Sequence, residues 1–499
     1  MEQHKFLWIA IVMVIVTIMI NVDFTAVNLS IATISHLMHS RLAEVQWILS
    51  GYMGAWAAGV VLGGKLSDTY GSKKIFLIGV ALFTLASALA GLSIAVWFLI
   101  LSRCIQGFGA ALFVPSAYGL IFTNVDSAKQ GQMLGLLGGA VGFGLAVGPT
   151  VGGIILHLLS WRWIFFINVP FGIIALMLIS SKATQPKLEQ AGKINWFAAV
   201  CLIGIIFLGL FDIQSVNQHQ EFEIRYWLSV IICLSSLFIY VLWQWNSASP
   251  FMQFRLFLKR EFSVSVFLYI IFQLCFAGVL FVMALYMQNV MGLTGLEAGY
   301  AFLAVTIMFG LLSPLSGRLM KKISLRRLLT IGMVALCISC FGLGILTRSD
   351  EWVILLIMFL IFGFGLGMTF PALNTSMMNS LTQQDIGVGS GIFTMSGALA
   401  NSISVNVSAL LLSLFSIEKL HLIISEKFSA LSESRISNLK EALLYGHYKK
   451  YIITHNQSSF LTMLHTSFVF ASRNMMLIYF GFAVVGLLGA VFLLKKVEA

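Results

Sequence analysis

The sequence predicts an all-α polytopic membrane protein that crosses the bilayer fourteen times, and three observations predict it. The 499 residues are 59% hydrophobic and only 10% charged, whereas a soluble domain carries about 25% charged residues. The mean hydropathy is +0.95. Apolar runs recur along the whole chain, and roughly 20 apolar residues are enough for a helix to span a hydrocarbon core about 30 Å thick.

These apolar runs give the order of the predicted spans. The first run, from Phe6, is too long for a signal-peptide core and lacks a small-residue cleavage site, so we expect it to remain as a helix. An even number of spans would place both termini on one side. We expect spans near residues 6–34, 43–65, 75–94, 96–123, 130–158, 162–181, 194–212, 225–245, 261–290, 296–317, 328–347, 352–380, 386–416 and 474–494.

The distribution of basic residues predicts which side the termini occupy. With the N-terminus inside, the inner loops and tails hold eighteen Lys and Arg residues and the short outer loops hold four. Short cytoplasmic loops are enriched in Lys and Arg, so both termini are predicted to be cytoplasmic, at the inner or plasma membrane. The net charge of +11 reflects this topology and indicates no nucleic-acid partner. The segment 418–472 is predicted to be an extracytoplasmic loop with short surface helices.

The sequence carries no pattern typical of an enzyme or a metal site. The stretch from Gly59 to Leu66 is one residue away from a phosphate-binding loop, but Leu66 stands where a hydroxyl is required, and a membrane helix precedes it instead of a strand. All six cysteines fall inside spans, where a packing role is the better interpretation. No metal-ligand spacing and no Ser/His/Asp set suited to catalysis occurs. We therefore expect no nucleotide, cofactor, metal or enzymatic activity.

Weak internal symmetry predicts two repeated halves. The loop GGKLSDTYGSKK (63–74) has a counterpart in SPLSGRLMKKISLRR (313–327), and the glycine-rich segment 135–153 has one in 387–400. Two six-helix bundles account for this symmetry. We expect the first in residues 1–181 and the second in 261–499, with a linker of two additional helices in 182–260. Repeated halves around a central site are typical of secondary transporters.

Three motifs resemble those of the major facilitator superfamily. The first resembles the family's signature after the second helix, with Thr69 and Ser72 in place of two expected basic residues, and its matching residues are Gly64, Leu66, Asp68, Gly71, Lys73 and Lys74. The second resembles the fourth-helix motif through Leu99, Arg103, Gln106, Gly107, Gly109 and Ala110. The third resembles the fifth-helix antiporter motif through Gly144, Gly148, Pro149, Gly152 and Gly153.

Two further segments resemble the fourteen-helix drug:proton antiporters within that superfamily. Val22–Asn28 is similar to their first-helix motif, although Ala32 stands where the motif has proline. Trp161–Pro170 is similar to the start of their sixth helix and is the most specific match. The resemblance implies the major facilitator fold and antiport of drugs against protons.

The resemblance also implies a gate at the inner end of the second helix. Asp68, Lys73 and Lys74, with Gly64 and Gly71, would bind across the interface between the bundles and hold one conformation closed. In the alternative reading Asp68 is solvated and the lysines only anchor the helix end. The ladder Gly144, Gly148 and Gly152 allows close helix contact, and Pro149 can bend the helix, so we expect this motif to shape the interface that opens and closes.

Asp23 and Arg103 are the candidate proton-coupling residues. An ionised side chain at mid-bilayer costs at least ~2.5–3.5 kcal/mol, so each one needs a partner or a function. Measured from the predicted outer helix ends, Asp23 lies about 16 Å deep and Arg103 about 10 Å deep. Similar depths within one bundle allow the two to meet. A static structural ion pair is the alternative.

Other polar residues are weaker candidates for the substrate cavity. Asn21, Thr25 and Asn28 share one face of the first helix, opposite Asp23. Packing is the alternative role for each candidate. The cavity candidates are Asn28, Gln46, Trp47, Tyr52, Gln106, Gln273, Asn374 and Asn401.

These features predict a proton-driven exporter of amphipathic or cationic compounds, in which 41 Phe and 22 Met residues offer an adaptable apolar cavity. Its partners would be a small-molecule substrate, protons and the lipid bilayer, with a periplasmic adaptor as a further option. A dedicated transporter of an endogenous metabolite such as a siderophore shares every motif and stays open. A membrane enzyme or receptor would need a catalytic cluster or a sizeable soluble domain.

Overall fold

The computed structural model describes residues 2–40, 42–45, 47–182, 194–219, 224–247, 250–293, 295–345, 352–427 and 458–493. Every regular element in these ranges is a helix. The first half contains α1 (Glu2–Leu37), α2 (Leu42–Val45), α3 (Trp47–Tyr70), α4 (Ser72–Gly91), α5 (Val96–Asn124), α6 (Ser127–Leu158), α7 (Trp163–Phe166) and α8 (Asn168–Lys182). The linker contains α9 (Trp196–His219), α10 (Ile224–Trp245) and the short 3₁₀ helix η1 (Phe254–Leu258). The second half contains α11 (Arg260–Asn289), α12 (Gly295–Leu319), α13 (Leu325–Ile345), α14 (Trp352–Asn379), α15 (Ile386–Lys427), α18 (Ser458–Leu488) and the π-helical end η2 (Gly489–Leu493).

The all-α polytopic prediction is confirmed. In the described ranges, thirteen helical stretches are long and apolar enough to cross a membrane, and they correspond to thirteen of the expected spans. The expected sixth span consists of α7 and α8, which are separated at Ile167. The remaining expected span is α9, whose apolar stretch Trp196–Gly209 is shorter than the rest.

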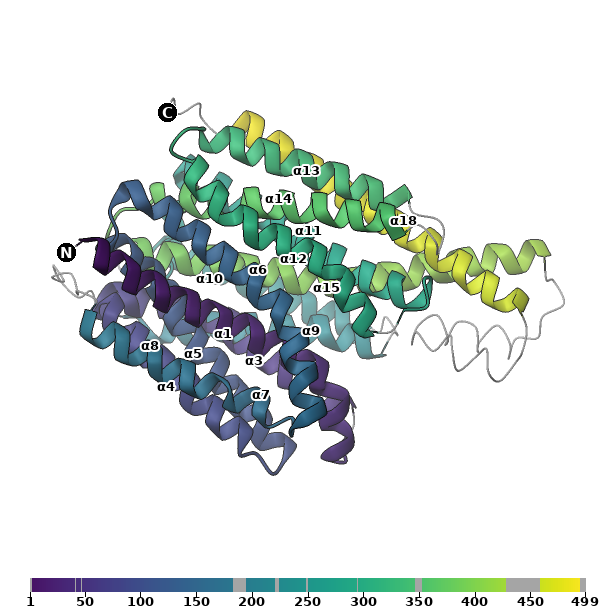
Figure 1. Cartoon of the computed structure of the whole chain (residues 1–499), viewed down its shortest axis with the longest axis horizontal. Helices are drawn as coiled ribbons and strands as arrows, with labels where there is room; N and C mark the ends of the chain where they lie inside the picture. The colour runs from purple at the N-terminus through teal and green to yellow at the C-terminus, as the bar shows by residue number, and fades with distance from the viewer. Residues whose placement is uncertain are drawn as a thin grey trace.

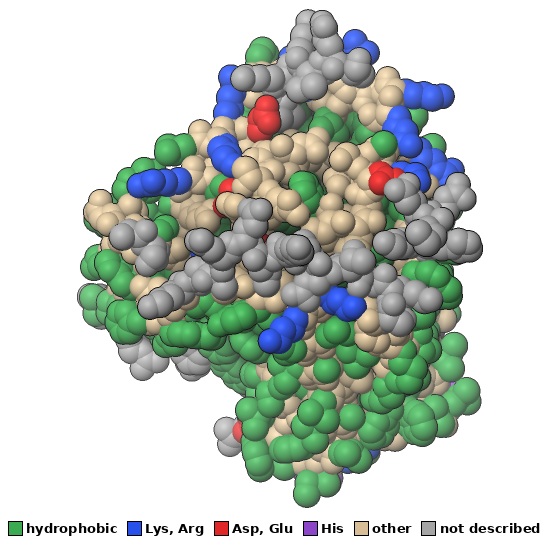
Figure 2. Space-filling model, turned by 90° about the vertical axis from the view of Figure 1, so that its left-hand side faces the viewer, with side chains coloured by type: hydrophobic (Ala, Val, Ile, Leu, Met, Phe, Trp, Pro, Cys, Tyr) green, Lys and Arg blue, Asp and Glu red, His purple; other side chains and the backbone are tan. Residues whose placement is uncertain are grey.

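The helices lie side by side in two groups, and α1 begins at the end of the molecule where α18 finishes (Figure 1). In the first group α3 and α4 pack on α5, α1 packs on α6, and α8 packs on α4. In the second group α12 and α13 pack on α14, while α11 and α18 pack on α15. Most Lys and Arg side chains visible in Figure 2 lie on the upper part of the end face where α1 begins, and apolar side chains cover its lower part.

The two groups meet mainly through two helix pairs, α3 with α15 and α6 with α12. Smaller contacts join α5 to α15 and α6 to α14. The linker helix α9 packs on both α3 and α15. The repeated segments 63–74 and 313–327 begin within the last turns of α3 and α12, and the repeated glycine-rich segments lie in α6 and α15. Each main contact therefore joins one copy of the loop repeat, at α3 or α12, to one copy of the glycine-rich repeat, in α15 or α6.

The segment 418–472, expected to be a loop, is partly a continuation of the neighbouring spans. Helix α15 runs on to Lys427 and α18 begins at Ser458. The extension of α15, IEKLHLIISEK (417–427), contains no Gly or Pro to end the helix. Short surface helices are expected across 418–472, and residues 428–457 of this segment lie outside the described residues.

Candidate functional site

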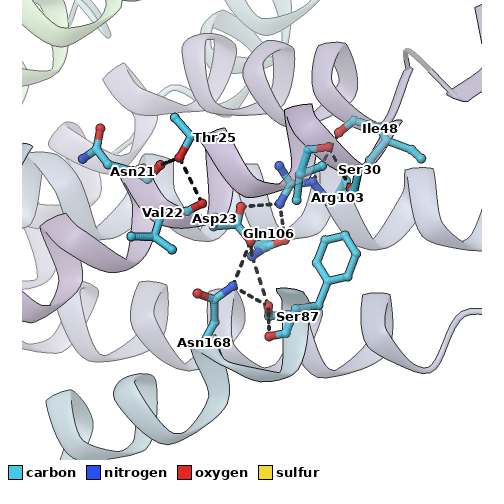
Figure 3. Close-up of polar contacts among 12 residues, drawn as sticks. Asn21, Val22, Asp23, Thr25, Ser30, Ile48, Ser87, Arg103, Gln106 and Asn168 are labelled. Carbon is cyan, nitrogen blue, oxygen red and sulfur yellow. Dashed lines mark hydrogen bonds and ion pairs between the residues drawn. The ribbon is translucent and has the colours of Figure 1, made fainter. Parts of the chain in front are cut away.

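A buried ion pair joins α1 to α5. Asp23 and Arg103 are both fully buried, and Arg103 Nη1 donates to Asp23 Oδ2 at 2.5 Å. Arg103 Nε donates to the carbonyl oxygen of Ile48 at 3.3 Å. A buried pair is tolerated only when further hydrogen bonds satisfy its remaining donors and acceptors. The contacts around Asp23 in Figure 3 supply these bonds.

Two side-chain amides complete the contacts of the Asp23 carboxylate. Gln106 Oε1 accepts a bond from Arg103 Nη1 at 2.7 Å, and its Nε2 donates to Asp23 Oδ1 at 3.2 Å. Asn168 Nδ2 donates to the same oxygen at 2.8 Å. Asp23 therefore accepts one charge-assisted bond from Arg103 on Oδ2 and two amide bonds on Oδ1.

Ser87 on α4 ties the two amides together. Its hydroxyl oxygen accepts from Gln106 Nε2 at 3.3 Å and from Asn168 Nδ2 at 3.0 Å. The same hydroxyl donates to the carbonyl oxygen of Phe165 at 2.9 Å. The network around Asp23 thus draws on α1, α4, α5, α7 and α8 (Figure 3).

The guanidinium of Arg103 lies over an aromatic ring on α3. Its Cζ is 4.1 Å from the ring centroid of Tyr52 and 5.7 Å from that of Phe165. Such cation–π contacts stabilise a desolvated guanidinium. Arg103 Nη2 and the Tyr52 hydroxyl have no hydrogen-bond partner among the described residues. Tyr52 and Gln106, which we expect in a substrate cavity, are buried and both contact Arg103.

Sequence reasoning missed Ser87 and Asn168 as members of this network. Asn168 lies within the motif Trp161–Pro170, so its position was marked, but nothing in the sequence indicated which residue it would bond. Nothing in the sequence indicated a role for Ser87, because a hydroxyl in an apolar helix often bonds a carbonyl oxygen of its own helix. Thr84 on the same helix does so, donating to the carbonyl oxygen of Val80.

The second candidate region lies where α3 meets the beginning of α15. Asp68 Oδ1 accepts from the Gly387 amide at 2.7 Å, and Oδ2 accepts from the Val388 amide at 2.8 Å. The first N–H groups of a helix lack intrahelical partners and carry partial positive charge, so a carboxylate stabilises them. Gly64 approaches Gly387 so closely that an added Cβ would overlap its carbonyl oxygen. Asp68 and Gly64 therefore connect the two bundles directly.

The two lysines of this motif contact different groups. Lys73 Nζ donates to the carbonyl oxygen of Ser180 on α8 at 2.8 Å. Lys74 Nζ lies 5.9 Å from the ring centroid of Tyr70. Both contacts stay within the first bundle, and binding of the lysines across the interface stays a prediction. Gly71 adopts φ 94°, the left-handed region that favours glycine, and starts α4 directly after α3.

The glycine ladder of the antiporter motif packs inside the first bundle. Gly144 lies against Ile18 and Asn21 on α1, Gly148 against Thr25, and Gly152 against Ala26. The ladder therefore does not itself lie between the bundles, and its role in shaping the interface that opens and closes stays a prediction. The sequence spacing predicts close packing but does not identify the neighbouring helix. Gly153 is half-buried, and the side chain of Pro149 lies outside the described residues.

An earlier set of glycines on α6 forms the contact between bundles. Gly135 lies against Ser313 and Pro314 on α12, and Gly142 lies against Gly310. The same face of α12 presents Gly317 to Gly131. An added Cβ at several of these positions would meet backbone atoms. Residues 131–142 therefore supply close contact between the two bundles.

The remaining cavity candidates have mixed surroundings. Asn374 is buried on α14, and its Oδ1 accepts from the Tyr118 hydroxyl of α5 at 2.7 Å, a further bond between the bundles. Asn28 is exposed. Trp47, Gln273 and Asn401 are half-buried, and Gln46 lies outside the described residues.

Comparisons with known proteins identify the family. The sequence profile of the Major Facilitator Superfamily matches residues 11–405. This chain belongs to that superfamily. It is 28% identical to the tetracenomycin C resistance and export protein of Streptomyces glaucescens, over 79% of this chain and 73% of the relative. It is 26% identical to the riboflavin transporter RibZ of Clostridioides difficile, over 77% of this chain and 83% of the relative.

Solved structures agree on the fold. The proton:xylose symporter XylE bound to 6-bromo-6-deoxy-D-glucose aligns with a TM-score of 0.62 at 13% identity, covering 98% of this chain and 95% of that one. At this identity the likeness concerns the arrangement of helices alone. The expectation of a major facilitator fold is confirmed.

Proposed function

We propose that this protein is a proton-coupled secondary transporter that exports amphipathic or cationic compounds by alternating access. The observation that carries the proposal is the fully buried Asp23–Arg103 pair, held by the amides of Gln106 and Asn168. A carboxylate in this position can exist ionised, bonded to Arg103, or protonated and released from it. Two such states are what coupling to a proton gradient requires.

The distribution of charge supports an orientation in the cell membrane or inner membrane with both termini on the cytoplasmic side. Basic side chains gather on the end face where α1 begins (Figure 2), and cytoplasmic loops are enriched in them. The Asp68 and Gly64 contacts with α15 lie at the same end, since α3 finishes and α15 begins there. In this orientation the contacts of Asp68 and Gly64 with α15 would close the cytoplasmic side.

In that state Asp23 would receive a proton from the outer side, and the proton would leave toward the cytoplasm after the bundles rearrange. The electrical part of the gradient supplies about 2.3 kcal/mol per charge per 100 mV. Protonation removes the charge that holds Arg103, so the ion pair is weakened in one step of the cycle and restored in the other. Substrate would move outward in the opposite step.

A substrate screen in everted membrane vesicles with an imposed pH gradient tests this proposal, with ethidium as the first probe. We expect Asp23→Asn to abolish pH-driven export because asparagine cannot titrate. Binding of the probe should survive within about tenfold, ~1.4 kcal/mol. Asp23→Glu should retain part of the activity with a shifted pH optimum. Undiminished proton-driven export by Asp23→Asn would show that coupling lies elsewhere.

A dedicated transporter of one metabolite, such as a siderophore, is the second candidate. The likeness to a riboflavin transporter favours it, because that relative is named for a single small metabolite. The same vesicles distinguish the two. A multidrug exporter should move several chemically unrelated cations, whereas a dedicated transporter should move one compound and be inhibited only by its close analogues.

A further inference from the structure

The position of Asn168 gives its amide a clear role. The residue starts α8, directly after the interruption at Ile167 that separates α7 from α8. Pro170 has no N–H to bond the carbonyl oxygen of Phe166, which favours the interruption at this point. Asn168 is 1% exposed, and Figure 3 places its amide between Asp23 and Ser87.

The neighbouring bonds fix which end of the Asn168 amide faces Asp23. The Ser87 hydroxyl donates its single hydrogen to the carbonyl oxygen of Phe165. Ser87 can therefore only accept from Asn168, so Asn168 must present its NH₂ group to both Ser87 and Asp23. Turning the amide over would set its oxygen against the Ser87 lone pairs. This arrangement suits an ionised carboxylate and cannot adapt to a protonated Oδ1.

We propose that Asn168 is a positioning residue that sets the pH at which Asp23 takes up its proton. Through Asn168 the protonation state of Asp23 also acts on the interruption between α7 and α8. A proton on Oδ1 would occupy one of the two lone pairs that accept from Gln106 and Asn168, and the contact with Asn168 would be lost. The beginning of α8 would then keep its bond to Ser87 but lose its bond to α1. The inference rests on the proposed coupling role of Asp23.

The titratable groups around Asp23 are few. Arg103 on α5 bonds it directly, and Tyr52 on α3 lies against the guanidinium. Ser87, Phe165 and Asn168, which α4, α7 and α8 contribute, carry no charge. Near this level α6 presents its glycine ladder to α1. Among the described contacts, Asn168 is therefore a donor whose removal takes away a hydrogen bond to the Asp23 carboxylate without removing a charge.

Infrared titration of the full-length protein in lipid nanodiscs tests this inference without a substrate. The carboxylic-acid C=O band of Asp23 is identified by its loss in Asp23→Asn and is followed against pH. In Asn168→Ala we expect the midpoint to rise by about one to two pH units, because a hydrogen bond to a charged group is worth roughly 1.5–3 kcal/mol. The pH profile of ethidium export should move by the same amount.

Ser87→Ala provides a second, milder variant that leaves the Asn168 amide in place. Without the Ser87 oxygen the amide is no longer oriented, so we expect a smaller rise of the same midpoint. Ser102→Ala is the matched control, because Ser102 is buried beside Arg103 and donates only to the carbonyl oxygen of its own helix residue Phe98. The control should leave the midpoint unchanged.

The outcomes separate this inference from the function on which it rests. If no band is lost in Asp23→Asn between about pH 2 and pH 9 (carboxyl pKa values in proteins centre near 3.5–4.2, with tails of several units), Asp23 does not titrate and the proposed function fails. If the band is present but both Asn168→Ala and Ser87→Ala keep the wild-type midpoint, the positioning role is overturned and the coupling role of Asp23 stands. If Asn168→Ala does not fold, the midpoint of Ser87→Ala decides alone.

Discussion

The two main contacts between the bundles occupy related places in the repeats but are built from different chemistry. Aligning Leu66-Ser67 with Leu315-Ser316 places Asp68 opposite Gly317. Asp68 binds the amides of Gly387 and Val388 on α15. Gly317 instead lies against the backbone of Gly131 on α6. One contact carries a charge, and its counterpart is close packing of backbones.

The helix beginnings explain this difference. Helix α15 starts at Ile386, so the amides of residues 387 and 388 belong to its unsatisfied first turn. Helix α6 starts at Ser127, and the amides of Lys129 and Gln130 already bond the carbonyl oxygen of Asp126. At the level of Gly131 there is no first turn left for a carboxylate. The position of a helix start therefore decides which copy of the repeat can use an aspartate.

The two contacts should therefore respond differently to the loss of a charge and to added side-chain volume. Separation of α3 from α15 breaks the hydrogen bonds between the Asp68 carboxylate and the two amides. A carboxylate at a helix N-terminus contributes about 0.3–1 kcal/mol, up to ~2 when partly buried. Separation of α6 from α12 loses only packing, which depends on shape. Charge should matter at the first contact and volume at both.

The largest effect is expected from volume at the charged contact. Gly64→Leu places a side chain against the carbonyl oxygen of Gly387, and overpacking of this kind costs about 1–3 kcal/mol. We expect ethidium export in vesicles to fall by about tenfold to hundredfold. Gly204→Leu on α9 is the matched control because nothing lies within 4 Å of an added Cβ there. Equal export by both variants would contradict closure at this contact.

A smaller effect is expected when the charge alone is removed. Asp68→Asn keeps one acceptor for the Gly387 or Val388 amide but loses the interaction of the charge with the helix start. We expect export to fall by roughly 5-fold to 30-fold, corresponding to about 1–2 kcal/mol, with membrane insertion unchanged. The control is Asp126→Asn, whose exposed carboxylate lies 3.7 Å from Lys129 Nζ on its own helix. Wild-type rates in Asp68→Asn would return Asp68 to the role of a solvated anchor.

Sequence reasoning identified what is costly in a membrane and missed what depends on neighbours. Asp23 and Arg103 could be found because a buried charge needs a partner. Asn168 could not, since an uncharged amide costs much less and its partners come from helices far apart in the chain. Glycine spacing predicted close packing for Gly144 but could not show that α1, and not the other bundle, lies beside it.

The smallest effect is expected from the lysines that follow Asp68. Lys73 bonds the carbonyl oxygen of Ser180 and Lys74 lies near the ring of Tyr70, both within the first bundle. Exposed interactions of this kind contribute about 0–1 kcal/mol. The double change Lys73→Met and Lys74→Met should therefore lower export by less than about fivefold, which corresponds to about 1 kcal/mol.

The matched control for this double variant is Lys321→Met with Lys322→Met, which removes the same charge from the related loop of the second bundle, where both side chains are exposed. Protein levels and the position of a reporter at the C-terminus should be followed in both variants, because loss of basic residues can disturb membrane insertion. With insertion intact, a loss of export as large as that of Asp68→Asn in the first variant alone would assign the lysines to the contact with α15. Equal, small losses in both would leave Asp68 as the charged residue of this motif that distinguishes the two contacts.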